Sequence, residues 1–247
     1  MKRVLLLFST CYFVGALDLP SEWSKCKRSD PNPLNDCVKN ALNVILPTLI
    51  KGIPALKMDH VLPLKVEEMS IEEGSGPVKV VQHYKNVEFR NIEAATTESV
   101  DATFNDDDFK LVLKLFGEDV TLFADYDFDG FILFLPMVGK GKATISTKNI
   151  TVTVRMVGDV PTVKNDRYAK LNSIEVTLEP KGAQIEFTNL FEGNEQLGAE
   201  MNHILTMEWE ALFHDVKHGY EEAVGQAIKF TIDQLFTKVP YNNLFLV

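Results

Sequence analysis

The sequence lacks the features that mark several large classes of protein. It has three cysteines in 247 residues and no C-x-x-C spacing for redox chemistry. Beyond the first sixteen residues, no apolar run reaches the roughly 20 residues that a bilayer-spanning helix needs. A G-x-S-x-G nucleophile elbow and a glycine-rich phosphate loop are also missing. We therefore expect no enzyme activity, no cofactor and no stable insertion into a membrane.

Basic residues are scarce as well, with 25 Lys and Arg against 35 Asp and Glu. Residues 1–16 resemble a secretion signal, because Lys2 and Arg3 precede an apolar stretch and small residues follow it. Cleavage there would leave residues 17–247 with a net charge of 23 − 35 = −12. Such a charge argues against nucleic acid or an anionic membrane surface as a partner. The sequence therefore predicts a secreted, extracellular protein of one domain.

The two cysteines that remain after cleavage are predicted to form a disulfide. Cys26 and Cys37 are an even pair in an oxidising compartment, and they close a short loop. The bond should tether a helix predicted from Leu34 to Ile50, in which Pro47 should produce a kink or a tighter turn. We expect a structural bond and not a redox-active one.

A helical stripe dominates the C-terminal part of the chain. Apolar side chains recur every three or four residues from about Glu195 to Phe236, which predicts one continuous helix. At 1.5 Å per residue it would be roughly 60 Å long. A sphere of about 230 residues is only about 45 Å across. The domain should therefore be elongated, with this helix as its spine.

From about Val61 to Phe191 the apolar period changes to two, which predicts β-strands. Glycines at Gly117, Gly139–Gly141 and Gly158 are expected to separate strands at hairpin-like intervals. An antiparallel sheet with one wet face must bury its other face, and the long helix is the large apolar partner. The predicted fold is α+β, with a highly curved antiparallel sheet wrapped around the long C-terminal helix.

Several short motifs, in this order, resemble the takeout and haemolymph juvenile-hormone-binding protein family of insects. They are the cysteine pair, Gly52–Leu56 followed by Leu62–Leu64, Tyr126–Gly130 leading into Leu133–Gly141, and Asn202–Trp209. The resemblance covers residues 17–247 and implies a tubular lipid-binding fold with an apolar tunnel between helix and sheet. The family's hormone carriers have a second, later disulfide. No cysteine follows Cys37, so the sequence is more similar to the takeout branch, and juvenile hormone stays open as the ligand.

The resemblance implies a secreted carrier, predicted to be monomeric, for a small hydrophobic ligand such as a terpenoid hormone or a fatty acid. Tyr126, Trp209 and Tyr220 could each donate a hydrogen bond to an oxygen of that ligand. The predicted ligand-binding residues are Tyr126, Phe128, Phe131, Phe134, Met137, Val152, Val154, Leu205, Trp209, Leu212, Phe213, Val216 and Tyr220. The N-terminal helix, tethered by its disulfide, would form a gate. In the alternative, these side chains form a solid core and the acidic surface of an extracellular signalling protein binds an unidentified receptor.

Three further motifs have a structural interpretation and a chemical one. His214–His218 resembles the zinc motif H-E-x-x-H, but both histidines should face solvent on the helix. Asp125–Gly130 resembles the start of a calcium loop, yet its twelfth position is Pro136 where a glutamate is required. We therefore expect no metal at either place. Asn149 begins the only N-glycosylation sequon, at the start of an apparent strand.

Overall fold

One large antiparallel sheet and one long helix make up most of the structure, a computed structural model that describes residues 19–29, 31–59, 61–163 and 165–246. The predicted secretion signal lies outside these residues. The helices, including four short 3₁₀ segments (η), are α1 (Pro31–Ile45), η1 (Leu46–Lys51), η2 (Pro54–Leu56), η3 (Ile92–Ala94), η4 (Phe191–Gly193), α2 (Glu195–Met207), α3 (Trp209–Phe236) and α4 (Tyr241–Leu244). The strands are β1 (Cys26–Lys27), β2 (Leu64–Ile71), β3 (Val78–Lys79), β4 (Gln82–Arg90), β5 (Thr96–Phe104), β6 (Asp108–Ile132), β7 (Leu135–Asp159), β8 (Thr162–Val163), β9 (Asp166–Arg167), β10 (Lys170–Glu179), β11 (Gly182–Phe187) and β12 (Phe245–Leu246).

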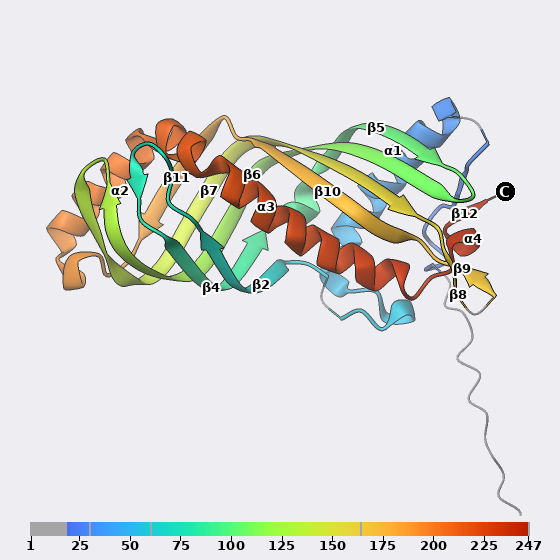
Figure 1. Ribbon diagram of the computed structural model, residues 1–247, viewed down its shortest axis with the longest axis horizontal. Helices are drawn as coiled ribbons and strands as arrows, with labels where there is room; N and C mark the ends of the chain where they lie inside the picture. The colour runs from blue at the N-terminus through green and yellow to red at the C-terminus, as the bar shows by residue number, and fades with distance from the viewer. Residues whose placement is uncertain (1–18, 30, 60, 164, 247) are drawn as a thin grey trace, which may run out of the picture.

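The sheet is built on a hairpin of two 25-residue strands, β6 and β7. The turn between them consists of Leu133 and Phe134, both with positive φ, a geometry whose twist matches that of the strands. Strand β7 pairs with β10 and β11 along its length, while β6 pairs with β3, β4 and β5, and β4 pairs with β2. Short strands on both sides of a long hairpin thus produce the predicted curved antiparallel sheet (Figure 1).

The strand breaks predicted at Gly117, Gly139–Gly141 and Gly158 are wrong, because all of these residues lie inside β6 or β7. At two of them glycine permits a close approach and not a turn. A Cβ on Gly141 would lie 2.3 Å from the carbonyl oxygen of Thr188, and a Cβ on Gly158 would lie 2.3 Å from that of Lys170. Neighbouring backbone passes too close to the strand for any side chain there.

The C-terminal helix begins and ends where the sequence predicts, but it is interrupted once. Glu208 separates α2 from α3 with φ −97° and ψ 14°. Hydrogen bonds still bridge the break, since Glu208 N–H donates to Ile204 O and Leu212 N–H donates to Glu208 O. Figure 1 shows α3 along the long axis of the molecule, with α2 at one end and α1 and α4 at the other. The predicted elongation around a helical spine is therefore confirmed. None of the described helices has the length and apolar character needed to span a bilayer.

The N-terminal helix and its disulfide also agree with the sequence. Helix α1 ends at Ile45 and continues as the tighter η1, which contains Pro47. The predicted Cys26–Cys37 bond is present and joins α1 to β1, which in turn pairs with β12 near the C-terminus.

Helix α2 covers the free edge of β11 with two side chains one helical turn apart. Asn202 Oδ1 accepts from Phe187 N–H at 2.9 Å, and its Nδ2 donates to Phe187 O at 3.0 Å. Thr206 Oγ1 contacts Ile185 N and O at 3.0 and 3.2 Å. These bonds satisfy backbone groups that an edge strand would otherwise expose.

Helix α1 covers the edge of β5 in the same way. Asn35 Oδ1 accepts from Ala102 N–H at 2.9 Å, and Asn43 Oδ1 accepts from Thr97 N–H at 2.7 Å. Helices α1 and α2 are thus both fixed to the sheet by hydrogen bonds from their side chains to the backbone of its edge strands.

Candidate functional site

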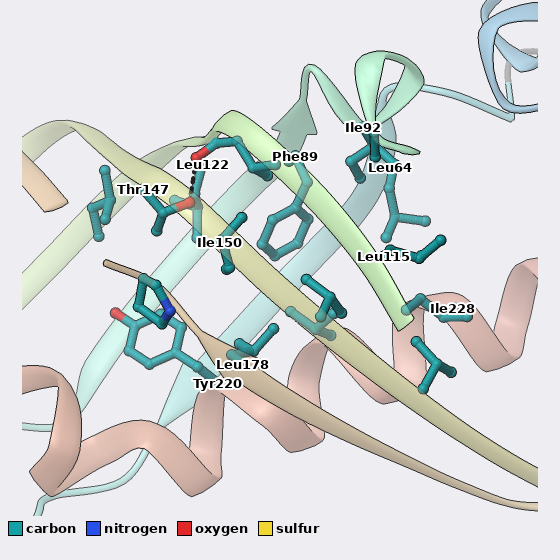
Figure 2. Close-up of a pocket in the computed structure, with 18 of the residues that line it drawn as sticks. Leu64, Phe89, Ile92, Leu115, Leu122, Thr147, Ile150, Leu178, Tyr220 and Ile228 are labelled. Carbon is teal, nitrogen blue, oxygen red and sulfur yellow. Dashed lines mark hydrogen bonds between the residues drawn. The ribbon is translucent and has the colours of Figure 1, made fainter. Parts of the chain in front are cut away.

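A cavity of about 480 Å³ lies between the sheet and α3. Tyr220, Val224 and Ile228 of α3 pack against both large apolar clusters of the core. Strand and helix side chains converge on the cavity, as Phe89, Ile150 and Ile228 do in Figure 2. The volume lies in the range of small-molecule sites.

The cavity follows the helix and is apolar at both ends. One end is formed by Trp23, residues of α1 and η1, Met58 and Leu235. The other end is formed by Phe128, Phe187, Leu205 and Trp209. None of the described residues that line it is charged. An ionised group placed inside would lose its hydration without gaining a counter-ion, which is strongly unfavourable.

A cluster of three polar side chains interrupts this apolar wall. Tyr220 OH lies 2.7 Å from Gln82 Oε1, Tyr84 OH lies 3.0 Å from the same oxygen, and the two hydroxyls are 2.9 Å apart. Gln82 and Tyr84 are only 6% and 1% exposed. Burial raises the pKa of Tyr84 well above its usual value and raises the pKa of Tyr220 to about 12. Both phenols are therefore neutral at physiological pH.

The two threonines that line the cavity direct their hydroxyl protons to the backbone. Thr147 Oγ1 donates to Val120 O at 2.9 Å, and Thr231 Oγ1 donates to Ala227 O at 3.2 Å. Thr147 lies on the cavity wall in Figure 2. Neither hydroxyl has a proton left for a ligand.

A long apolar cavity between a curved sheet and a helix agrees with the comparison to known families. The family model described as haemolymph juvenile hormone binding protein matches residues 4–246. The chain belongs to the haemolymph juvenile hormone binding protein family. This family, which includes the takeout proteins, comprises binding proteins for hydrophobic ligands and is not an enzyme family.

Relatives in the haemolymph juvenile hormone binding protein family cover nearly the whole chain. The circadian clock-controlled protein daywake of Drosophila melanogaster is 26% identical over 248 residues, covering 98% of this chain and 94% of that protein. Daywake of Drosophila yakuba is 26% identical over 233 residues, covering 92% and 88%. The crystal structure of Takeout 1 from Epiphyas postvittana superposes with a TM-score of 0.76 at 23% identity, over 90% of this chain and 99% of that one. This last likeness establishes a shared fold.

Most of the residues predicted to bind ligand line the cavity of this family member. They come from the two strands β6 and β7 and from both parts of the C-terminal helix. They are Phe128, Val152, Val154, Leu205, Trp209, Leu212, Phe213, Val216 and Tyr220.

Two of the remaining residues are buried beside the cavity and do not line it. Met137 is fully buried in the core. Tyr126 is 3% exposed, and its hydroxyl donates to Thr188 O at 2.6 Å. Burial raises the pKa of Tyr126 to about 12, so it stays neutral and bound to the backbone. Its predicted role as a donor to the ligand is not supported by this geometry.

The last two predicted residues lie on the outside, which corrects their assignment to the cavity wall. Phe134 is 97% exposed because it forms the turn between β6 and β7. Phe131 is 53% exposed because alternate side chains of β6 face inward, and Phe128 and Ile132 occupy the inward phase nearby.

The sequence predicts the N-terminal helix as a gate, but the predicted ligand-binding residues include none from the N-terminal half of the chain. Leu42, Ile45 and Leu49 of α1 and η1 line one end, and Gln82 and Tyr84 of β4 supply most of the polar cluster. The helical spacing of Leu42, Ile45 and Leu49, and the alternation of Gln82 and Tyr84 along β4, are the sequence signals for inward-facing side chains at these positions.

The zinc-like motif has a structural role. His214 and His218 are exposed, as expected for the outer face of α3. Asp215 accepts hydrogen bonds from the backbone N–H groups of Gly76 at 2.7 Å and Val78 at 2.9 Å. This carboxylate therefore ties α3 to the segment before β4. Within the described ranges, no group of three His, Cys, Asp or Glu side chains could hold a metal ion.

The calcium-like motif is part of β6. Tyr126 and Phe128 are buried, whereas Asp127 and Asp129 are exposed on the opposite face of the strand. Lys140 on the paired strand lies 2.8 Å from Asp127. The acidic residues thus form the outer, solvated face of the sheet, as the alternation predicts.

Proposed function

We propose that the protein is a secreted carrier that holds one small hydrophobic ligand in this cavity. The observation that carries the proposal is a cavity of about 480 Å³ whose described lining contains no charged side chain. Each methylene group moved from water into such a space contributes about 0.8 kcal/mol. A ligand of a dozen carbons can therefore bind usefully with little polar recognition. Terpenoid hormones, fatty-acid derivatives and related lipids have this chemistry.

The size of the cavity also argues against the alternative of an interaction protein with a solid core. Protein interiors are normally packed as densely as organic crystals. Engineered cavities cost roughly 24 cal/mol per Å³. An empty space of this volume would then cost on the order of 10 kcal/mol, comparable to the whole stability of a typical domain. A ligand that fills the space offsets this cost.

The first experiment is native mass spectrometry of the protein secreted from insect cells, followed by solvent extraction. We expect a stoichiometric lipid or terpenoid to be released and a mature N-terminus at residue 17. A clean apo mass that does not change on incubation with juvenile hormone or long-chain fatty acids would contradict the carrier function. That result would favour the receptor-binding alternative.

A matched pair of variants on one helix tests the location of the ligand. Ile228→Trp places a larger side chain in the cavity, whereas Phe230→Trp changes a residue that is 69% exposed. Binding of the apolar fluorophore N-phenyl-1-naphthylamine should fall at least ten-fold in the first variant and stay unchanged in the second. Equal binding by both variants would place the ligand elsewhere.

We also propose that Asn149 carries a glycan in the secreted protein. Its side chain is exposed, and it has a positive φ within β7 at the point where the strand changes partner from β11 to β10. Enzymatic deglycosylation should lower the mass of the wild-type protein and leave Asn149→Gln unchanged. No mass change in the wild type would contradict this.

A further inference from the structure

We infer that Gln82, Tyr84 and Tyr220 recognise a neutral ligand through a hydrogen-bond acceptor, such as a ketone, ester or ether oxygen, that lies among apolar groups within the cavity. The inference rests on the proposed carrier function and adds the class of ligand to it.

The cluster lies within the cavity and not at either end. Tyr220 is on α3 between Trp209 and Leu235, which line opposite ends. At 1.5 Å per residue, Tyr220 is about 16 Å from Trp209 and about 22 Å from Leu235 along the helix. Apolar wall therefore continues on both sides of the cluster. A ligand oxygen held there would have apolar groups extending along the cavity.

The cluster has more donors than its internal contacts can use. Three contacts join Gln82 Oε1 and the two phenol oxygens, but only the two phenols supply protons to them. The amide nitrogen of Gln82 donates to no acceptor within the part of the chain that the structure describes, although the residue is only 6% exposed. Gln82 lines the cavity, and its two N–H groups have no partner among the described residues. An unpaired donor on an otherwise apolar wall is stabilised by an acceptor from outside the protein.

The surplus does not depend on which way the Gln82 amide is turned. With the amide reversed, its two N–H groups would donate to Tyr84 and Tyr220. One phenol proton could then bridge the two hydroxyls, the other would be free, and Oε1 would take the uncontacted position of the amide nitrogen. Four donor hydrogens share at most three contacts in either orientation. At least one donor hydrogen is therefore left for a ligand acceptor in both cases.

The same surroundings select against an ionised ligand group at this point. None of the described lining residues is charged, so a carboxylate beside the cluster would have no counter-ion. An ammonium group would meet neither a carboxylate nor an ionised phenol, because burial keeps Tyr84 and Tyr220 neutral. A neutral oxygen matches both the donors and the low polarity.

The test compares tridecan-7-one with tridecane, which differ by one mid-chain carbonyl. Each ligand displaces N-phenyl-1-naphthylamine from the wild type and from a triple variant, Gln82→Met/Tyr84→Phe/Tyr220→Phe, which removes all three polar groups together. We expect the ratio of the dissociation constants, ketone over alkane, to rise at least five-fold in the triple variant. Because the alkane is measured in the same variant, changes in cavity shape and ligand hydration cancel from the comparison.

Tyr126→Phe is the matched control, since it removes a phenol hydroxyl that donates to Thr188 O and belongs to a residue outside the cavity lining. Its ratio should equal that of the wild type. A second measurement needs no variant: the infrared carbonyl stretch of ¹³C-labelled tridecan-7-one bound to the wild type should lie below its value in hexane. A carbonyl stretching frequency equal to that in hexane would overturn the inference. So would an unchanged ratio of the two dissociation constants in a triple variant that still binds tridecane. In either case the carrier function stands. Failure of the fluorophore and both ligands to bind the wild type would overturn both.

Discussion

Removing the Cys26–Cys37 disulfide tests whether α1 closes one end of the cavity. The bond links cysteines 11 residues apart and ties α1 to β1. On the cavity side, Leu42 and Ile45 of the same helix form part of the lining. We choose Cys26→Ser/Cys37→Ser, because replacing both residues leaves no free thiol.

The size of the effect follows from the loop that the bond closes. In the chain-entropy model, a loop of about 12 residues contributes about 3 kcal/mol to the free energy of unfolding. For a domain of this size, 1 kcal/mol shifts Tm by about 2–4 °C, so Tm should fall by about 6–12 °C. Asn35 and Asn43 still bind the edge of β5, so the helix should stay folded on the sheet but open more often. If the full 3 kcal/mol acts on that opening, ligand release accelerates about 100-fold.

Two assays separate the stabilising role of the bond from the gating role. Thermal unfolding followed by tryptophan fluorescence gives the Tm, and stopped-flow release of N-phenyl-1-naphthylamine gives the off-rate. Asp36→Ala, an exposed substitution on the same helix, is the control and should change neither. A lower Tm with an unchanged off-rate would refute the gate, and no change in either would refute the tether as well.

Four other substitutions test parts of the fold. Asn202→Ala should lower the free energy of unfolding by about 2 kcal/mol in urea and speed amide exchange in β11, because two bonds to the Phe187 backbone are lost; unchanged exchange would contradict the edge-covering role. Asp215→Ala should cost about 3 kcal/mol by the same assay, since a carboxylate then no longer accepts two backbone N–H groups, whereas His214→Ala should stay within about 0.5 kcal/mol. A zinc-dependent rise in Tm that His214→Ala abolishes would instead support a metal site. For Tyr220, burial raises the pKa from 10.0 to about 12, so the folded state retains its proton longer and stability should fall as pH rises from about 10 to about 12; Tyr220→Phe should flatten this part of the profile, and an unaltered profile would contradict it.

The elements that the sequence predicts well are those fixed by the period of apolar side chains. The stripe from Glu195 to Phe236 gives both ends of the helical segment, because apolar side chains on one face of α2 and α3 pack against the core along its length. Across the break at Glu208 the apolar side chains keep the same three-or-four-residue spacing, so the spacing does not reveal the break. The strand breaks predicted at the glycines of β6 and β7 are wrong for a different reason. A glycine that permits close packing and a glycine that permits a turn cannot be distinguished in a single sequence.

The site is predicted less completely, because inward direction and contact with a cavity are separate properties. Alternation places Phe128 and Met137 inward, and both are buried, yet only Phe128 lines the cavity. The difference depends on how neighbouring side chains fill the remaining space, which no period records. Phe134 fails because the turn at Leu133 begins within an apolar run, where composition still favours a buried strand.

The contacts that hold this fold together are largely separate from the surface that faces the ligand. Asn35, Asn43 and Asn202 fix helices to backbone groups at the sheet edges, and none of them lines the cavity. Side chains on the cavity wall can therefore change in size without breaking the bonds that position the helices. The polar cluster around Gln82 is the exception, because its three members bond one another across β4 and α3 and also line the cavity. It is at this cluster that a substitution should alter stability and ligand preference together.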